Sequence, residues 1–275
     1  MSERLFWVVA AIAVVATVAG VLALQRSGSD DDGNASAVKN EPALLEKMQL
    51  LSFYDWEASV IGPRGRPEPG DAAVTGGPDA GRASALPYYD AVHRAAARPA
   101  DNEPDNARPV SFFYAVDRAR RQVFGRGAPS SDEALADAPA ERRAGAAVLE
   151  VKPGTAVIRA ETTRDRWYVI EDDVALRGRE IKAAQRGTDT INDRPVIIFD
   201  FTDAGITQFR ELTRGLASRG ARSSLERVED DPALHNQHFA VVYGDVLVTT
   251  PFVDFRRSPD GLDARSGSQL SAELP

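Results

Sequence analysis

The sequence predicts an α+β protein with a single N-terminal transmembrane helix and then an antiparallel sheet with packed helices, ending in a β-α-β-β head. Three observations lead to this prediction. Residues Leu5–Leu24 carry no charge over a length that spans a bilayer. An amphipathic stripe runs through residues 203–220. Two short β-branched runs flank Gly244-Asp245, a glycine-first turn typical of a type II′ hairpin.

Composition excludes several classes of function. The chain has 275 residues, no cysteine, 33 basic residues and 41 acidic residues, which gives a formal net charge of −8. The absence of cysteine excludes disulfides, thiolate metal sites and cysteine nucleophiles. A net acidic chain without a segregated basic face does not fit a nucleic-acid-binding protein. We therefore expect partners other than nucleic acid.

The amino terminus predicts a membrane anchor over residues 1–24. Twenty helical residues rise about 30 Å, which matches one hydrocarbon core. The run is longer than the apolar part of a secretory signal peptide, so we expect a retained anchor, with a cleaved leader as the alternative. Residues 25–42 are polar and predict a flexible tether. We expect a single-pass protein of the cell membrane with its amino terminus inside and its body outside.

Residues 43–165 predict an irregular, linker-rich, base-like region. Pro42 suits the first turn of a short helix. The stretches Ile61–Leu86 and Gly125–Arg143 are dominated by small, proline and acidic residues, so we expect loop or linker there. The aromatic cluster Phe53–Glu57 is interpreted as part of the core.

Two hairpins and one helix are predicted inside this region. Ser111–Val116 and Arg121–Phe124 are strand-like runs on either side of a polar turn. Val148–Val151 and Thr155–Ala160 flank Lys152-Pro153-Gly154, in which proline and glycine suit a type II turn. The helix is expected over Pro87–Ala97.

Residues 166–275 predict a compact head domain. The helix that begins at Thr202 or Asp203 is expected to end at Gly220, where a left-handed residue suits a helix stop. The hairpin His238–Tyr243 and Val246–Thr250 is the strongest local signal in the chain. The other predicted segments are the strand Arg166–Glu171, the short helix Arg179–Arg186, the strand Pro195–Phe201, the loop Ala221–Gln237 and a final strand Ser268–Leu274.

The residues that carry chemistry do not form a recognisable catalytic or metal motif. His235 and His238 have a metal-compatible spacing, but zinc sites need three or four protein ligands, so we interpret them as a polar loop entering a strand. Glu171–Asp173 is interpreted as exposed surface and Arg118–Arg121 as a solvated turn. We expect no catalytic residue, no cofactor and no metal. An extracytoplasmic enzyme is the least favoured function because the search for a catalytic group finds none.

Several segments of the carboxy-terminal part resemble SecD, a membrane subunit of the bacterial protein-export complex SecDF. The similarity is to the head of its first extracytoplasmic domain and covers Arg166–Pro275. The turn Gly244-Asp245 differs from the usual Asp-Gly of that family, and the loop Ala221–Gln237 is longer. The segments that carry the resemblance are Leu176–Lys182, Arg194–Phe201, Phe209 with Leu212-Thr213, Phe239–Leu247, Thr250–Val253 and Gly267–Ser271.

The resemblance implies an accessory role in Sec-dependent protein export, with contact to translocating polypeptide outside the cytoplasm. The implied partners are Sec translocon subunits similar to SecF and SecY, together with unfolded exported polypeptide and the membrane. The proton-coupling membrane bundle of the family has no counterpart in the segments that match, so we expect this chain to need partners. The alternative is a tethered binding or structural protein that reuses the head fold without a Sec role.

The hairpin Phe239–Thr250 is the predicted contact with polypeptide. An exposed edge strand can pair with an extended chain through main-chain hydrogen bonds, which gives contact without sequence specificity. The predicted contact residues are Phe239, Val241, Tyr243, Val246 and Val248.

Overall fold

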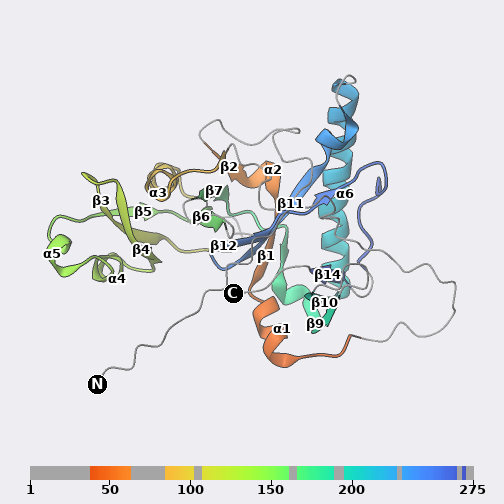
Figure 1. The fold of residues 1–275 in the computed structure, drawn as a ribbon, viewed down its shortest axis with the longest axis horizontal. Helices are drawn as coiled ribbons and strands as arrows, with labels where there is room; N and C mark the ends of the chain where they lie inside the picture. Colours follow the sequence, from red (N-terminus) through yellow and green to blue (C-terminus); the bar gives the residue numbers. More distant parts are fainter. Residues whose placement is uncertain are drawn as a thin grey trace.

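The computed structural model describes residues 38–62, 84–101, 107–160, 166–188, 195–227, 231–264 and 268–270. The predicted anchor Leu5–Leu24 lies outside the described residues. No helix in the described ranges is long and apolar enough to cross a membrane. Figure 1 shows a central sheet with a small lobe at one end and the long helix α6 at the other.

The central sheet has eight strands in the order β2-β7-β6-β12-β11-β1-β8, and β13 pairs with β11 beside this path. It is antiparallel except for the pair β12 and β6, which is parallel. The predicted α+β class is therefore confirmed, with one parallel pair added. The strands are β1 (Leu51–Asp55), β2 (Val60–Ile61), β6 (Thr155–Ala160), β7 (Trp167–Glu171), β8 (Leu176–Arg177), β11 (Gln237–Tyr243), β12 (Val246–Thr249) and β13 (Phe252–Val253).

A second sheet and helix α6 complete the β-α-β-β unit. The sheet has the order β14-β10-β9, formed by β9 (Ile181–Thr188), β10 (Pro195–Phe201) and β14 (Ser268–Leu270). Helix α6 (Asp203–Glu226) follows β10, and Thr202 caps it by accepting from the Gly205 amide at 3.1 Å. The order β10-α6-β11-β12 confirms the predicted order of elements.

The first helix covers an edge of this second sheet. Helix α1 (Pro42–Met48) begins at Pro42, as predicted, and the Glu41 amide before it donates to the Ala184 carbonyl of β9 at 2.8 Å. The Glu41 carboxylate accepts from the Arg186 amide at 2.9 Å and from its guanidinium at 2.6 Å. Since α1 buries Leu44 in the head core, the segment after the tether is part of the folded body.

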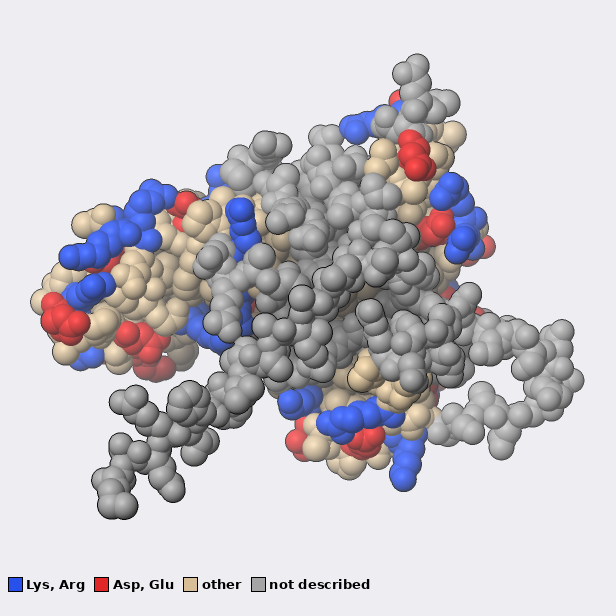
Figure 2. Space-filling view, in the orientation of Figure 1, with Lys and Arg blue, Asp and Glu red and all other residues tan. Residues whose placement is uncertain are grey.

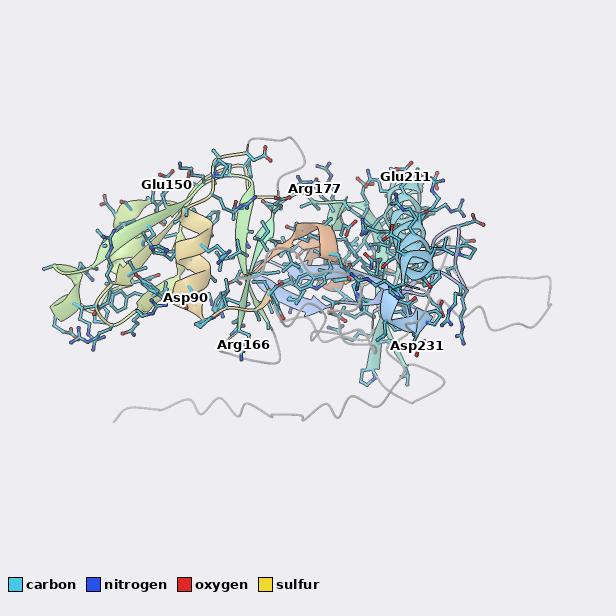
Figure 3. All side chains as sticks on the ribbon, turned by 90° about the horizontal axis from the view of Figure 1, so that it is seen from above. Asp90, Glu150, Arg166, Arg177, Glu211 and Asp231 are labelled. Carbon is cyan, nitrogen blue, oxygen red and sulfur yellow. The ribbon has the colours of Figure 1, made fainter. Side chains whose placement is uncertain are left out.

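The small lobe is a three-stranded sheet between helices. Its order is β4-β3-β5, from β3 (Phe112–Asp117), β4 (Gln122–Ala128) and β5 (Ala147–Val151). Helix α3 (Tyr88–Ala96) packs with one face of this sheet and with Trp167 and Val169 of β7. Figure 3 shows α3 between the lobe and the central sheet. The opposite face packs with Ala134 of α4.

Two predicted linkers are wrong where the structure describes them. Within Gly125–Arg143 the chain completes β4 and forms α4 (Ser131–Ala136) and α5 (Ala140–Arg143). Ser130 caps α4 by accepting from the Glu133 amide at 3.2 Å. This Ser-x-x-Glu capping motif predicts a helix start, but the acidic, alanine-rich composition of the segment favoured a linker instead. Of Ile61–Leu86, residues 63–83 lie outside the described ranges, but Ile61 belongs to β2 and Leu86 exchanges two backbone hydrogen bonds with Trp167.

The predicted hairpin of Val148–Val151 with Thr155–Ala160 does not form. Gly154 does adopt positive φ, at +85°, as the predicted type II turn requires. The two strands nevertheless enter different sheets, because β5 pairs with β3 whereas β6 pairs with β7 and β12. The predicted domain boundary at residue 166 lies between β6 and β7, and these two strands pair with each other in the central sheet.

Three further predictions in the head are corrected. Arg179–Arg186 is mostly strand β9, because pairing along β10 outweighs its helix-like spacing. Helix α6 continues through Gly220, which is buried against the His235 carbonyl and the Phe255 ring. The predicted loop Ala221–Gln237 therefore contains the end of α6, the 3₁₀ turn η3 (Pro232–His235) and the first residue of β11.

Alternate residues of β11 enter two different cores. Phe239 and Val241 lie in the core shared with α6, whereas Ala240 and Val242 lie in a core on the other face of the sheet. In the first core Phe53, Phe201, Phe209 and Phe239 form a ring cluster, with Phe209 and Phe239 edge to face at 5.4 Å. The predicted core role of the Phe53–Glu57 cluster is thus confirmed for Phe53.

Candidate functional site

The predicted contact hairpin lies in the middle of the central sheet. Strand β11 is placed between β1 and β12, and β12 is placed between β11 and β6, so the hairpin is not at an edge of the sheet. The structure buries four of the predicted contact residues and leaves Tyr243 partly exposed; the four are Phe239, Val241, Val246 and Val248.

The expectation of a free edge at this hairpin is therefore wrong. Local signals correctly predicted the turn, since Gly244 has a φ of +59° and Val246 pairs with Tyr243 across it. They could not predict that β1 would pair with β11 or that β6 would pair with β12, because both partners are distant in sequence. Contact of these five residues with polypeptide remains a prediction, and only Tyr243 offers an accessible side chain.

The site that the structure assembles instead is a buried polar cluster where α2 (Trp56–Ser59), α6 and β11 meet. The Nδ1 atom of His238 donates to Glu57 Oε1 at 2.6 Å, and the His238 amide donates to Glu57 Oε2 at 2.9 Å. The two side chains are only 3% and 4% exposed. Burial of a carboxylate needs such paired donors to replace the hydrogen bonds of water.

An arginine extends this cluster toward α6. The Arg219 guanidinium donates to both Asp55 carboxylate oxygens at 2.6 and 2.7 Å, and to Gln237 Oε1 at 2.9 Å. One helix turn later Ser223 lies 2.9 Å from Nδ1 of the buried His235. These bonds hold β1, α6 and β11 at defined relative positions, because charge-assisted pairs depend strongly on geometry.

The two neighbouring histidines face different partners. His235 interacts with α6 through Ser223, and His238 interacts with α2 through Glu57. Among the described residues no three His, Asp or Glu side chains are grouped as a metal site would require. The Nδ1 atoms of the two rings therefore make separate hydrogen bonds with different helices.

A second buried carboxylate connects the central sheet to the segment before β3. Asp172 is fully buried and accepts from the Tyr54 hydroxyl at 2.7 Å and from the Arg108 amide at 2.6 Å. Burial raises the pKa of Asp172 above its ordinary value, although both hydrogen bonds act in the opposite direction. The expectation that Glu171–Asp173 is exposed surface is therefore wrong at Asp172.

Sequence reasoning did not find these polar pairs. The members of the Glu57–His238 pair are separated by 181 positions and those of the Tyr54–Asp172 pair by 118. The only local hint was the position of polar residues such as Asp55 and Glu57 within an otherwise apolar aromatic segment. Such residues indicate burial with a partner, but they do not identify the partner.

Comparison with known proteins identifies one part of the chain. Residues 155–261 match the family model described as SecDF, P1 head subdomain. This range begins at β6 and includes the β10-α6-β11-β12 unit, and it confirms the resemblance predicted from the sequence. Helix α1, strand β1 and the lobe lie outside it. No curated protein and no solved structure matches the chain.

Proposed function

Because residues 155–261 match the SecDF P1 head subdomain, we propose that this chain is a membrane-anchored accessory component of Sec-dependent protein export. In this proposal its body contacts translocating polypeptide outside the cytoplasm. The family match is the observation that carries the proposal. It relates the chain to the Sec-associated export machinery and to a non-catalytic, extracytoplasmic domain of a transporter component.

The buried polar cluster supports a mechanical role for the head. Strands β10 to β12 and helix α6 share one core with β1 and α1, and Arg219 binds Asp55 across that junction. A head built in this way transmits force as one body, because its elements are joined by packed side chains and ion pairs. Sec translocon subunits similar to SecF and SecY, and unfolded exported polypeptide, are the proposed partners.

A tethered binding or structural role without Sec partners is the second candidate. It is favoured by the lobe, which lies outside the family match and forms its own sheet between α3 and α4. A fold alone does not determine function, so the two candidates need a direct comparison.

In vivo photocrosslinking separates the two candidates. A photoreactive residue at Tyr243 or at Leu225, which is 76% exposed near the end of α6, should capture Sec subunits or exported chains. The same probe at Glu150, an exposed residue of the lobe, serves as the position control. Crosslinks restricted to the protein itself or to cell-wall components, together with unchanged secretion in a deletion strain, would replace the export role with the structural one.

A further inference from the structure

Arg121 adopts a backbone conformation that is unfavourable for its residue type. Its φ is +51°, and no other non-glycine residue in the described ranges has positive φ. It is the last residue of the turn between β3 and β4, next to the pair Asp117 and Gln122. Glycine adopts this left-handed conformation without the clash between Cβ and the following carbonyl oxygen. Strain of this kind is retained mainly where the side chain has a role.

The unusual backbone directs the Arg121 side chain onto helix α3. Its guanidinium carbon lies 5.1 Å from the centre of the Tyr89 ring, and the group also forms an ion pair with Asp90. Both partners are in the first turn of α3, and Figure 3 labels Asp90 on that helix. Despite these two contacts the Arg121 side chain remains 63% exposed, so it can still donate to another molecule.

The turn and the helix line an open hollow of about 510 Å³ on the surface. This volume is within the range of sites that bind small ligands or single anchoring side chains. One wall is aromatic and the other is basic. The residues used in the argument below are Tyr88, Tyr89, Asp90, Arg120, Arg121 and Gln122.

The aromatic wall is held in place by contacts of Tyr88 with strands β4 and β7. The Tyr88 ring stacks on Trp167 with ring centres 3.8 Å apart, and the Tyr88 hydroxyl donates to the Gly125 carbonyl at 3.0 Å. Trp167 belongs to β7 of the central sheet, so the wall is fixed on the body of the molecule. A wall fixed before binding loses little conformational freedom when a ligand arrives.

The basic wall consists of two arginines, and each is already paired with one carboxylate. Arg121 pairs with Asp90, which also lines the hollow. Arg120 binds Asp117 at 2.8 Å but remains 64% exposed, so guanidinium donors that are not used in this pair can bind another acceptor. Figure 2 shows Lys and Arg side chains gathered along the upper margin of the lobe. The two exposed guanidinium groups can therefore still donate hydrogen bonds to a carboxylate of a ligand.

We propose that this hollow is a docking site for a partner polypeptide segment in which an acidic residue adjoins an aromatic residue. The carboxylate would be held by Arg120 and Arg121, because guanidinium groups bind carboxylates through paired, charge-assisted hydrogen bonds. The aromatic side chain would pack on Tyr88 and Tyr89. Tyrosine and arginine around a pocket form the composition typical of the strongest contacts in protein interfaces.

The site lies outside residues 155–261, so the proposal goes beyond the export role and does not depend on it. A polypeptide is favoured over a lipid surface because the side chains beside the arginines are aromatic rather than further cations. Two adjacent residues of a polypeptide can supply both groups, a carboxylate for the arginines and an aromatic ring for the tyrosines. Lipid binding is retained as an outcome of the experiment.

The variant Arg121→Gly tests the proposal because it separates binding from folding. Glycine relieves the left-handed strain and removes the guanidinium, so the variant should be at least as stable as the parent protein. Binding should nevertheless weaken about tenfold or more, the size expected for loss of one good charge-assisted contact. Arg126→Gln, which changes a similarly exposed arginine that does not line the hollow, is the matched control.

The measurement is fluorescence anisotropy on the full chain in mild detergent. The probe is a short fluorescein-labelled Gly/Ser peptide with Glu-Phe-Glu at its centre, compared with Gln-Phe-Gln and Glu-Ala-Glu versions. We expect the Glu-Phe-Glu peptide to bind more tightly than either of the others. Arg121→Gly should weaken this binding, whereas Arg126→Gln should not. Equal binding of the three peptides, or unchanged binding by Arg121→Gly, would overturn the proposal. Preference for phosphatidylglycerol vesicles over the peptides would replace it with a lipid site.

Discussion

His238 Nδ1 lies 2.6 Å from the Glu57 carboxylate, and this contact joins the start of β11 to the short helix α2 deep in the protein. The same carboxylate also accepts from the His238 amide. One acidic side chain thus binds both the ring Nδ1 atom and the backbone amide of one histidine. The pair is a structural junction, since both side chains are almost completely buried.

His238→Ala should lower the free energy of unfolding by about 3 kcal/mol or more, because it leaves the Glu57 carboxylate buried with only one of its two donors. Glu57→Gln is the comparison, since its amide oxygen can still accept from the His238 amide without carrying a charge. Glu57→Gln should lower the free energy of unfolding by less than His238→Ala does. Urea denaturation of both variants measures the difference, and a loss below about 1 kcal/mol for His238→Ala, the range of surface changes, would contradict the assignment.

Two glycines of α6 should respond in opposite directions to the same substitution. Gly215→Ala should stabilise the protein by up to about 1 kcal/mol, because alanine favours helix and the added Cβ meets no atom within 4 Å. Gly220→Ala should destabilise it by about 1–3 kcal/mol, because the Cβ would lie 2.7 Å from the His235 carbonyl oxygen. Thermal or urea unfolding checks both values. Equal stabilisation by both substitutions would show that α6 does not pack on η3 as described.

Titration of Asp172 should make the protein less stable as the pH rises from the unfolded pKa of this carboxyl to its higher folded pKa. Burial raises the pKa of this carboxyl in the folded state above the unfolded value of about 3.9. In the interval between those two values the folded state binds more protons than the unfolded state, so raising the pH reduces the free energy of unfolding. Above the folded value the contribution becomes constant.

Asp172→Asn isolates that contribution. Its amide oxygen can still accept from one of the two donors, Tyr54 and Arg108, but it no longer titrates. We expect the free energy of unfolding of the parent protein, minus that of the variant, to fall as pH rises from about 4 and then to level off. Urea titrations at a series of pH values measure this difference. A difference that rises with pH would mean that the carboxylate is stabilised in its charged form.

Local sequence determined those features that depend on neighbouring residues. Thr202 caps α6 because a hydroxyl oxygen can reach the Gly205 amide three residues later. Gly154 and Gly244 turn the chain because they tolerate positive φ. Pro42 begins α1 because its fixed φ suits a first helical turn. The order and spacing of segments in the head likewise identified the family that residues 155–261 match.

Tertiary structure decided which strands pair and which polar groups meet. The chain turns at Gly154, yet β5 and β6 enter different sheets, because β5 pairs with β3 and β6 pairs with β7 and β12. The predicted contact hairpin became interior when β1 and β6 joined its two sides. A strand has the same local signals at an edge and in the middle of a sheet, whereas its burial depends on the strands placed beside it. For the same reason Glu57 found His238, and Arg121 found Tyr89, only in the folded chain.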